Sequence, residues 1–205
     1  MPPATEETPH EKHDWHSPAY VEDWVARDLA RDAERRTRLR RMLCAAPLAR
    51  DAAIAVLDVG GGYGVVSEEV LGLFPRARVT LQDYSRPMLD AARQRLARHH
   101  DRVGYALADL RDPAWTDAVG GPFDLAVSAI AIHNLRRRDL IAQCYRGVAR
   151  VLKPGALFLD YDLFDLIGGV AAQTQSLKAA GFAAVDCLWQ EGPQAILAAS
   201  AAGGA

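Results

Sequence analysis

The sequence predicts an α/β fold in which a doubly wound parallel sheet carries helices on both faces. From residue 54 onward, short β-branched runs alternate with amphipathic segments, which is the pattern of consecutive strand–helix units. The run 123–132 is largely apolar, as in a strand buried on both faces. The chain has 205 residues, half of them hydrophobic, enough for one domain with a sizeable core and an extension.

The front of the chain is expected to form that extension. Residues 1–16 are rich in proline, charge and histidine and predict a flexible tail. Residues 18–46 predict one helix, because Ser17 is suited to cap it, Pro18 fits its first position and Pro47 ends it. The predicted parts are a tail at 1–16, a helical lid or extension at 17–53 and the main domain at 54–199.

Strands and helices are then expected in alternation. The predicted strands cover 54–59, 78–83, 103–109, 123–132, 156–162, 183–192 and 193–200. The predicted helices cover 65–74, 85–99, 112–119, 137–152 and 167–180. The last two strands meet at Gly192-Pro193 and predict an antiparallel end to the sheet.

Charge and cysteine content argue against several classes of protein. The formal net charge is −2, whereas nucleic-acid-binding domains are usually strongly basic. No apolar run approaches the roughly 18 residues that span a membrane, and no secretory signal is visible. Cys44, Cys144 and Cys187 lie far apart, which favours a reducing compartment. We therefore expect a cytoplasmic protein that binds neither nucleic acid nor membrane.

Two features of the front part have alternative interpretations. His10, His13 and His16 form a tract that could bind a metal, but no cysteine accompanies them and no metal site is expected. The arginines between Arg35 and Arg41 could contact a polyanion. Their acidic neighbours favour a solvated helix face instead.

A glycine-rich turn follows the first strand and opens a helix. Gly60, Gly62 and Gly64 give the spacing GxGxG, whereas a dinucleotide fingerprint would need glycine at the position of Val65. Open α/β sheets bind ligands at the carboxyl ends of their strands, and glycine lets the backbone approach a ligand closely. Asp58 could accept hydrogen bonds from the turn or from a ligand amine.

Two further acids lie at the ends of the next two strands. A carboxylate such as Asp83 offers two acceptor oxygens to the two hydroxyls of a ribose. Asp109 could accept from an adenine amino group. Each acid could instead cap the following turn. Three acids at three successive strand ends favour a nucleoside ligand.

Five segments occur in the order VLDVGGGYG, VTLQDYSRPML, ALADLRDP, FDLAVSAIAIHNL and RVLKPGALFLDYD. In this set the chain resembles the class I S-adenosylmethionine-dependent methyltransferases of the small-molecule type, over 54–199. The resemblance implies a Rossmann-like seven-stranded sheet of order 3-2-1-4-5-7-6 with strand 7 antiparallel. It also implies S-adenosylmethionine as cofactor and S-adenosylhomocysteine as product.

The resemblance also implies roles for individual residues around the methionine part of the cofactor. The three glycines of the turn would surround the methionine and the ribose. Asp58 would hold the turn or the amino group, and the carbonyl of Ala129 would meet the methionyl amine.

For the adenosine part, the resemblance implies a second set. Asp83 would bind the ribose hydroxyls, and Tyr84 and Met88 would flank the adenine. Asp109 would meet the adenine amino group, with Leu110 beside the ring.

Methyl transfer from a sulfonium is an in-line displacement, so a base is needed only if the acceptor must lose a proton. His133 is the candidate base, because it follows a buried strand at its carboxyl end; it could instead cap the next helix. Because side chains alternate along a strand, either Asp160 or Asp162 is expected to face the cofactor, and we select Asp160; both could instead be caps or surface acids. Tyr20 or Trp15 is expected near the acceptor, and Tyr20 completes the predicted catalytic set with His133 and Asp160.

The predicted activity is methyl transfer to an O, N or C atom of a small metabolite. The alternatives are a non-methylating enzyme on the same cofactor scaffold, a non-catalytic S-adenosylmethionine-binding partner protein, and a dinucleotide oxidoreductase that Val65 disfavours. Only about 15 residues connect the fifth strand to Lys178, so the acceptor side would either stay open or be closed by the front helix or by a partner. A homodimer is one such partner.

Overall fold

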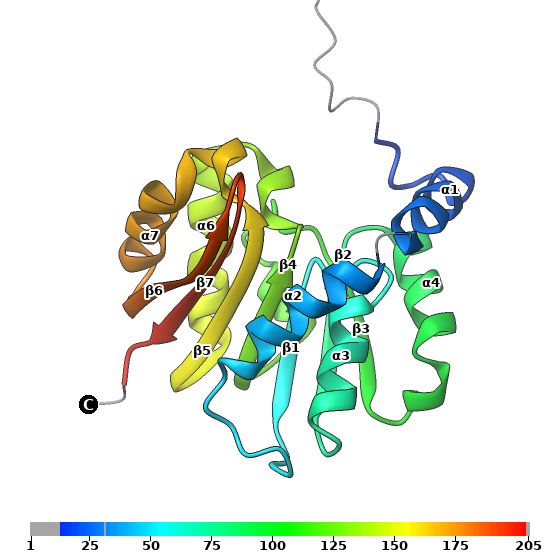
Figure 1. The fold of residues 1–205 in the computed structure, drawn as a ribbon, viewed down its shortest axis with the longest axis horizontal. Coiled ribbons are helices and arrows are strands. Elements are labelled where there is room, and N and C mark those ends of the chain that lie inside the picture. The colour runs from blue at the N-terminus through cyan, green and yellow to red at the C-terminus, as the bar shows by residue number, and fades with distance from the viewer. Residues whose placement is uncertain (1–12, 31, 204–205) are drawn as a thin grey trace, which may run out of the picture.

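Seven strands lie in the order β3-β2-β1-β4-β5-β7-β6 (Figure 1), as the sequence predicts. The computed structural model describes residues 13–30 and 32–203. Strands β1 to β5 run parallel to one another, and β7 runs antiparallel between β5 and β6. The strands are β1 Ala55–Val59, β2 Arg78–Asp83, β3 Val103–Leu107, β4 Phe123–Ala129, β5 Leu152–Leu163, β6 Phe182–Glu191 and β7 Gln194–Ala201.

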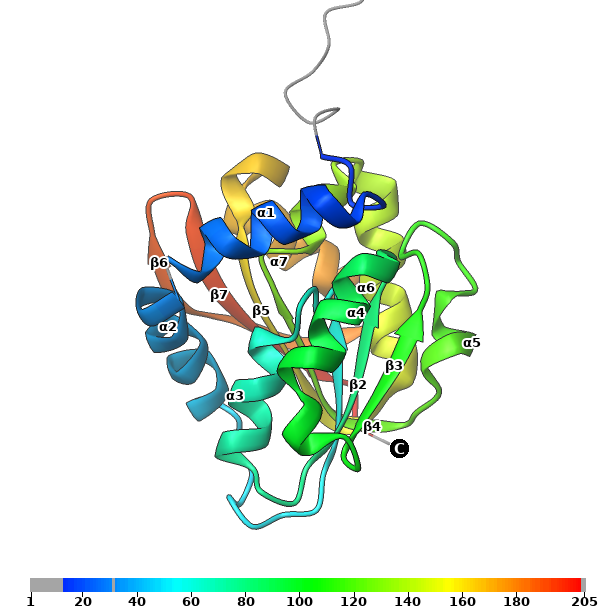
Figure 2. The same ribbon diagram turned by 90° about the vertical axis from the view of Figure 1, so that its right-hand side faces the viewer.

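Helices cover both faces of the sheet, and α1 crosses its carboxyl-end edge (Figure 2). One face carries α2 Asp32–Cys44, α3 Val65–Leu73 and α4 Arg86–Arg95. The opposite face carries α5 Trp115–Val119, α6 Arg138–Val151 and α7 Gly169–Ala179. The crossing helix is α1 Pro18–Leu29, and short 3₁₀ turns lie at η1 Ala97–His99, η2 Ile132–Leu135 and η3 Phe164–Ile167.

Each face of the sheet has its own apolar core. Leu39 and Leu89 are fully buried on one face, and Tyr145 and Phe158 are fully buried on the other. Helix α4 begins where the sequence indicates, because the Ser85 hydroxyl accepts a hydrogen bond from the Met88 N–H at 3.1 Å. The two cores hold the parallel strands in register, so the loops at their carboxyl ends start from fixed positions.

The prediction of one helix over 18–46 is wrong, because the chain forms α1 and α2 with a break between them. A straight helix of that length would measure about 43 Å, more than the width of a small domain. The break lets each helix bury its own apolar stripe. Val21 of α1 is buried, as are Leu39 and Met42 of α2, where α2 packs beside α3.

Three predicted strand boundaries also need correction. The third strand ends at Leu107, so Asp109 lies in the following loop. The fourth ends at Ala129, because Ile130 adopts a positive φ of 53° and turns the chain out of the sheet. The fifth begins at Leu152 and not at residue 156, so residues 153–155 lie within β5.

The cysteines and the helices bear on two further expectations. Cys44, Cys144 and Cys187 are free, so none forms a disulfide. Within 13–30 and 32–203, no helix combines the length and the apolar character that a membrane span requires.

Candidate active site

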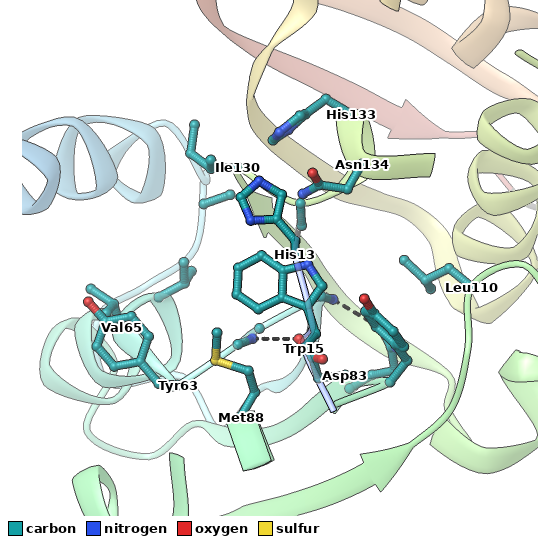
Figure 3. Close-up of a pocket in the computed structure, with 18 of the residues that line it drawn as sticks. His13, Trp15, Tyr63, Val65, Asp83, Met88, Leu110, Ile130, His133 and Asn134 are labelled. Atoms are coloured by element: carbon teal, nitrogen blue, oxygen red, sulfur yellow. Dashed lines mark hydrogen bonds between the residues drawn. The ribbon is translucent and has the colours of Figure 1, made fainter. Parts of the chain in front are cut away.

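A cavity of about 330 Å³ opens at the carboxyl ends of β1, β2 and β4 (Figure 3). The glycine-rich turn and the end of β2 form one side. The loop after β4, with Ile130 and His133, forms another side, and His13 and Trp15 reach it from the front segment. The structure therefore has a cavity at the carboxyl ends of the strands, where the parallel sheet predicts a ligand.

The turn brings bare backbone to the cavity. Gly60 and Gly62 both line it and have positive φ, at 64° and 53°. A Cβ on Gly62 would meet nothing closer than the Met88 sulfur at 4.0 Å, so it would project into open space. Gly64 does not line the cavity; a Cβ there would meet Leu96 at 2.9 Å, and this glycine lets α3 and α4 pack closely.

Asp83 ends β2 and faces the cavity with a fixed carboxylate. One oxygen accepts from the Gly62 N–H at 2.9 Å and the other from the Ser85 N–H at 2.8 Å. Burial raises the pKa of Asp83, and these backbone donors oppose the rise. Each oxygen keeps a second acceptor position, so the carboxylate can take two more hydrogen bonds from a ligand.

Asp58 lies behind the turn and does not line the cavity. It is fully buried, and one oxygen accepts from the Ser67 hydroxyl at 2.6 Å. Its other oxygen has no hydrogen-bond partner within the described part of the chain. Burial raises the pKa of Asp58 to about 7. Of the two roles that the resemblance implies, this position fits support of the turn and not contact with a ligand amine.

The remaining predicted cofactor residues line the cavity: Tyr84, Met88, Asp109, Leu110 and Ala129. Arg111, which the sequence analysis missed, forms an ion pair with Asp109 at 2.7 Å and lies 5.6 Å from the Tyr84 ring. Burial would raise the pKa of Asp109, but hydrogen bonds from Arg111 lower it overall. The Asp109 carboxylate is therefore held as an anion beside the cavity.

Gln82 is a second residue that sequence reasoning missed. Its side-chain oxygen accepts from the Gly60 N–H at 2.9 Å, and its amide donates to the Ala108 carbonyl at 2.6 Å. Gln82 thus ties the turn after β1 to the loop after β3. A polar side chain directly before Asp83, near the end of a predicted strand, was the available signal.

His133, which the sequence predicts as a base, lies in η2 on the side of the cavity formed by the loop after β4 (Figure 3). The residue is buried, with 6% of its surface exposed. Its Nδ1 is 2.5 Å from the Oδ1 of Asp162, and its backbone N–H donates to the Oδ2 of the same carboxylate at 2.9 Å. Two contacts to one buried carboxylate fix both the loop and the ring.

Asp160 and Tyr20, the other two predicted catalytic residues, do not line the cavity. Asp160 is fully buried beside the Tyr145 hydroxyl at 3.4 Å, and burial followed by the charge of Asp162 holds its pKa well above the usual range. Positions 160 and 162 share one face of β5, because side chains alternate along a strand. The expectation that alternation would bring only one of them to the site was therefore wrong. The Tyr20 hydroxyl bonds to the His13 ring.

The front segment approaches the cavity with aromatic rings. The Trp15 ring stacks on His13 at 5.4 Å and meets Trp24 edge-to-face at 5.3 Å. The carbonyl of Trp15 accepts from the Ser85 hydroxyl at 2.5 Å, directly beside Asp83. His10, from the same histidine tract, lies outside the described residues. The sequence expectation of an aromatic approach to the site agrees with this arrangement for Trp15.

A cluster of three polar side chains joins the front helices to the glycine-rich turn. Arg35 of α2 forms an ion pair with Asp28 of α1 and donates to the Tyr63 hydroxyl at 2.7 Å. All three residues line the cavity, and sequence reasoning missed each of them. Charged residues on a helix usually indicate a solvated face, so the sequence carried no specific signal for Arg35.

Comparison with known proteins places part of this chain in a protein family. Residues 56–155 match the family described as methyltransferase domain. The chain carries a class I S-adenosylmethionine-dependent methyltransferase domain. It resembles an O-methyltransferase family protein from Burkholderia thailandensis with a TM-score of 0.73 and 19% identity, covering 94% of this chain and 62% of that one.

Other similarities agree with the methyltransferase domain. The chain resembles PigF, solved with S-adenosylhomocysteine, with a TM-score of 0.69 and 14% identity over 91% of this chain and 60% of that one. It is 42% identical to a release factor glutamine methyltransferase of Chlorobaculum tepidum over 76 residues, 36% of this chain and 26% of that protein. It is 33% identical to a malonyl-[acyl-carrier protein] O-methyltransferase of Bacillus cytotoxicus over 92 residues, 45% and 28% of the two chains. The chain thus spans about a quarter of the length of these curated relatives.

The cavity of this methyltransferase domain fits S-adenosylmethionine, the cofactor of the family. The open space beside Gly62 admits a ligand against bare backbone. The free acceptor positions of Asp83 suit two ribose hydroxyls. Tyr84, Met88 and Leu110 supply apolar surface for a flat base.

Proposed function

We propose that the protein transfers the methyl group of S-adenosylmethionine to an O, N or C atom of a small molecule. One observation carries the proposal: the turn and Asp83 share a single cavity with His133 and the front aromatic residues. A donor held at the end of β2 and an acceptor held beside His133 would therefore meet in the same space.

The front segment supports a small acceptor. Trp15 and His13 line the cavity from the side of α1, and the Ser85 bond to the Trp15 carbonyl holds this segment next to the cofactor residues. A cavity bounded in this way suits a metabolite better than a long polymer. The net charge of −2 also gives little general attraction to nucleic acid.

The chain's own residues would act by binding and orientation. When bound, S-adenosylmethionine would supply a methyl group attached to a positively charged sulfur, and the leaving group would be a neutral thioether. Asp83 and Asp109 would orient the nucleoside part, and the backbone at Gly60 and Gly62 would approach the methionine part. Trp15 would exclude water from the acceptor side. Alignment and desolvation account for most of the rate increase in such displacements.

Product analysis with a labelled cofactor tests the proposal. The protein is incubated with methyl-labelled S-adenosylmethionine and a cell extract, which is then separated into small-molecule, protein and RNA fractions, and labelled products are identified by mass. We expect label in one small-molecule fraction, at a mass one methyl group higher. Asp83→Ala serves as the binding-deficient control, and its label should fall to background.

Two outcomes would contradict the proposal. If the label is found on protein or RNA and not on a small molecule, the acceptor is a macromolecule and the proposed acceptor class is wrong. Tight S-adenosylhomocysteine binding with cofactor consumption but no methylated product would instead indicate a non-methylating enzyme on the same scaffold. The fold alone does not choose among these reactions.

A further inference from the structure

The pair formed by His133 and Asp162 joins two segments at the acceptor side of the cavity. Asp162 lies near the end of β5 and is fully buried, and His133 lies in η2 after β4. The carboxylate binds His133 twice, at Nδ1 and at the backbone N–H. It also accepts a hydrogen bond from the Leu163 N–H, with 2.8 Å between the nitrogen and the carboxylate oxygen. Two backbone N–H groups therefore donate to this carboxylate, beside its contact with Nδ1 of His133.

This arrangement determines which ring nitrogen of His133 carries the proton. A carboxylate that accepts at 2.5 Å from Nδ1 favours the tautomer with hydrogen on Nδ1. The other nitrogen, Nε2, then has a free lone pair. Nε2 has no hydrogen-bond partner among the residues that the structure describes, and His133 lines the cavity. The free lone pair is therefore available to a molecule in that space.

We propose that Asp162 is a positioning residue that makes His133 the proton acceptor of this site, and that the acceptor substrate is methylated on a hydroxyl oxygen. The inference rests on the proposed methyl transfer and deepens it. A hydroxyl is a poor nucleophile until its proton leaves, so a site with a fixed base suits a phenol, enol or related hydroxyl. A thioether acceptor would not need such a base.

The step balances without another reactant. The acceptor oxygen forms a bond to the methyl carbon while its O–H bond breaks. The proton moves to Nε2 of His133, and the electron pair of the broken carbon–sulfur bond stays on sulfur. The imidazolium that results is stabilised by the Asp162 carboxylate at Nδ1. The acceptor becomes an ether, and the proton leaves to solvent after product release.

Asp160 provides a matched control for Asp162. Both aspartates are fully buried and both lie on the same face of β5. Asp160 contacts Tyr145 and not His133. Substitution of either by asparagine removes one buried carboxylate from the same strand, but only Asp162→Asn changes the partner of the His133 ring.

Nitrogen NMR of the full chain, labelled with ¹⁵N in its histidine rings, tests the pair with and without S-adenosylhomocysteine. His133→Gln assigns the signal. We expect hydrogen on Nδ1 and an unprotonated Nε2 in the neutral ring, with the Nδ1 proton shifted strongly downfield. Asp162→Asn should abolish this signature, and Asp160→Asn should keep it. Hydrogen on Nε2 in the unsubstituted protein would overturn the proposal, and this reading does not depend on whether Asp162→Asn or Asp160→Asn folds.

Kinetics with the acceptor found by product analysis supply the second readout. We expect an O-linked methyl group, and a loss of at least about a hundredfold in kcat for His133→Gln and Asp162→Asn, within the usual range for a positioned base. The KM for S-adenosylmethionine should stay unchanged. Undiminished kcat in His133→Gln would overturn the role of the pair. Failure to bind S-adenosylhomocysteine would instead refute the proposed function, while the NMR spectrum would still report on the pair.

Discussion

Two regions enclose the cavity, and they are held in place by different contacts. One is the proposed cofactor edge, formed by the glycine-rich turn and the end of β2, and the other is the front segment with His13 and Trp15. At the cofactor edge, the Gly61 N–H donates to the Gln82 carbonyl and the Gly62 N–H to Asp83, both at 2.9 Å, so neighbouring strands hold the turn. The front segment is held mainly by ring contacts of Trp15 and by one hydrogen bond from Ser85. The proposed cofactor site is therefore held by the sheet, whereas the proposed closure over the acceptor would depend on side-chain packing.

The largest expected effect concerns the buried support of the cofactor edge. Burial raises the pKa of Asp58 from 3.8 to about 7, so the folded state binds a proton more tightly than the unfolded state. The stability from this group is complete below pH 3.8 and is lost as the pH rises through about 7. At about 1.4 kcal/mol per pKa unit, the loss is roughly 4 kcal/mol.

Asp58→Asn should remove this slope, since asparagine does not titrate. Urea unfolding of both proteins at several pH values measures the difference in their free energies of unfolding. We expect the unsubstituted protein to lose stability relative to the variant across this range. If the free energies of unfolding of the two proteins change in parallel with pH, Asp58 is not a neutral buried support. The contrast between a cofactor edge held by the sheet and a front segment held by side-chain packing would then weaken.

Asp83→Ala should produce the largest loss of cofactor affinity. The change removes two acceptor oxygens for the ribose and the acceptor of the Gly62 N–H. Loss of hydrogen bonds to a charged group should weaken S-adenosylhomocysteine binding roughly a hundredfold. Calorimetry measures the change, with Asp90→Ala, an exposed acid on α4, as control. Equal affinities for the two variants would refute the assignment of the ribose to Asp83.

Gly62→Ala should have an intermediate effect and can be separated from backbone strain. Gly155 also has positive φ, 74°, and a Cβ there would meet open space away from the cavity. Both alanine variants should lose about 1 kcal/mol of stability from strain. Only Gly62→Ala should weaken S-adenosylhomocysteine binding, on the order of tenfold, because its methyl group enters the cavity. A similar loss of affinity in both variants would show that strain alone is responsible.

Trp15→Ala should have the smallest effect on the cofactor. The Ser85 bond goes to the backbone carbonyl of Trp15 and survives the substitution. Loss of ring contacts of about 0.5–1.5 kcal/mol predicts roughly a threefold to tenfold weaker affinity for S-adenosylhomocysteine. A loss as large as that for Asp83→Ala would mean that the front segment binds the cofactor itself, and the distinction between the two regions would fail.

The cofactor edge was predictable because its signals are local in sequence. A glycine-rich turn after a strand, and Asp83 at the end of the next strand, can be placed from periodicity and spacing alone. The parallel sheet then brings these strand ends together. The structure confirms the sheet order and puts Gly60, Gly62 and Asp83 in one cavity.

The acceptor side was less predictable because its contacts join distant parts of the chain. The bond between His133 and Asp162 spans 29 positions and requires both the register of β4 against β5 and the turn at Ile130. The break between α1 and α2 has no glycine or proline to signal it, and it follows from the way two apolar stripes pack. Tertiary packing determined these features, and no local propensity encoded them.

Calorimetric titration of the full chain with S-adenosylhomocysteine tests the central claim most directly, with NAD titrated in parallel. The account predicts one site per chain with a dissociation constant in the micromolar range, and no binding of NAD. A well-folded protein that gives no heat with S-adenosylhomocysteine, or that binds NAD instead, would contradict it.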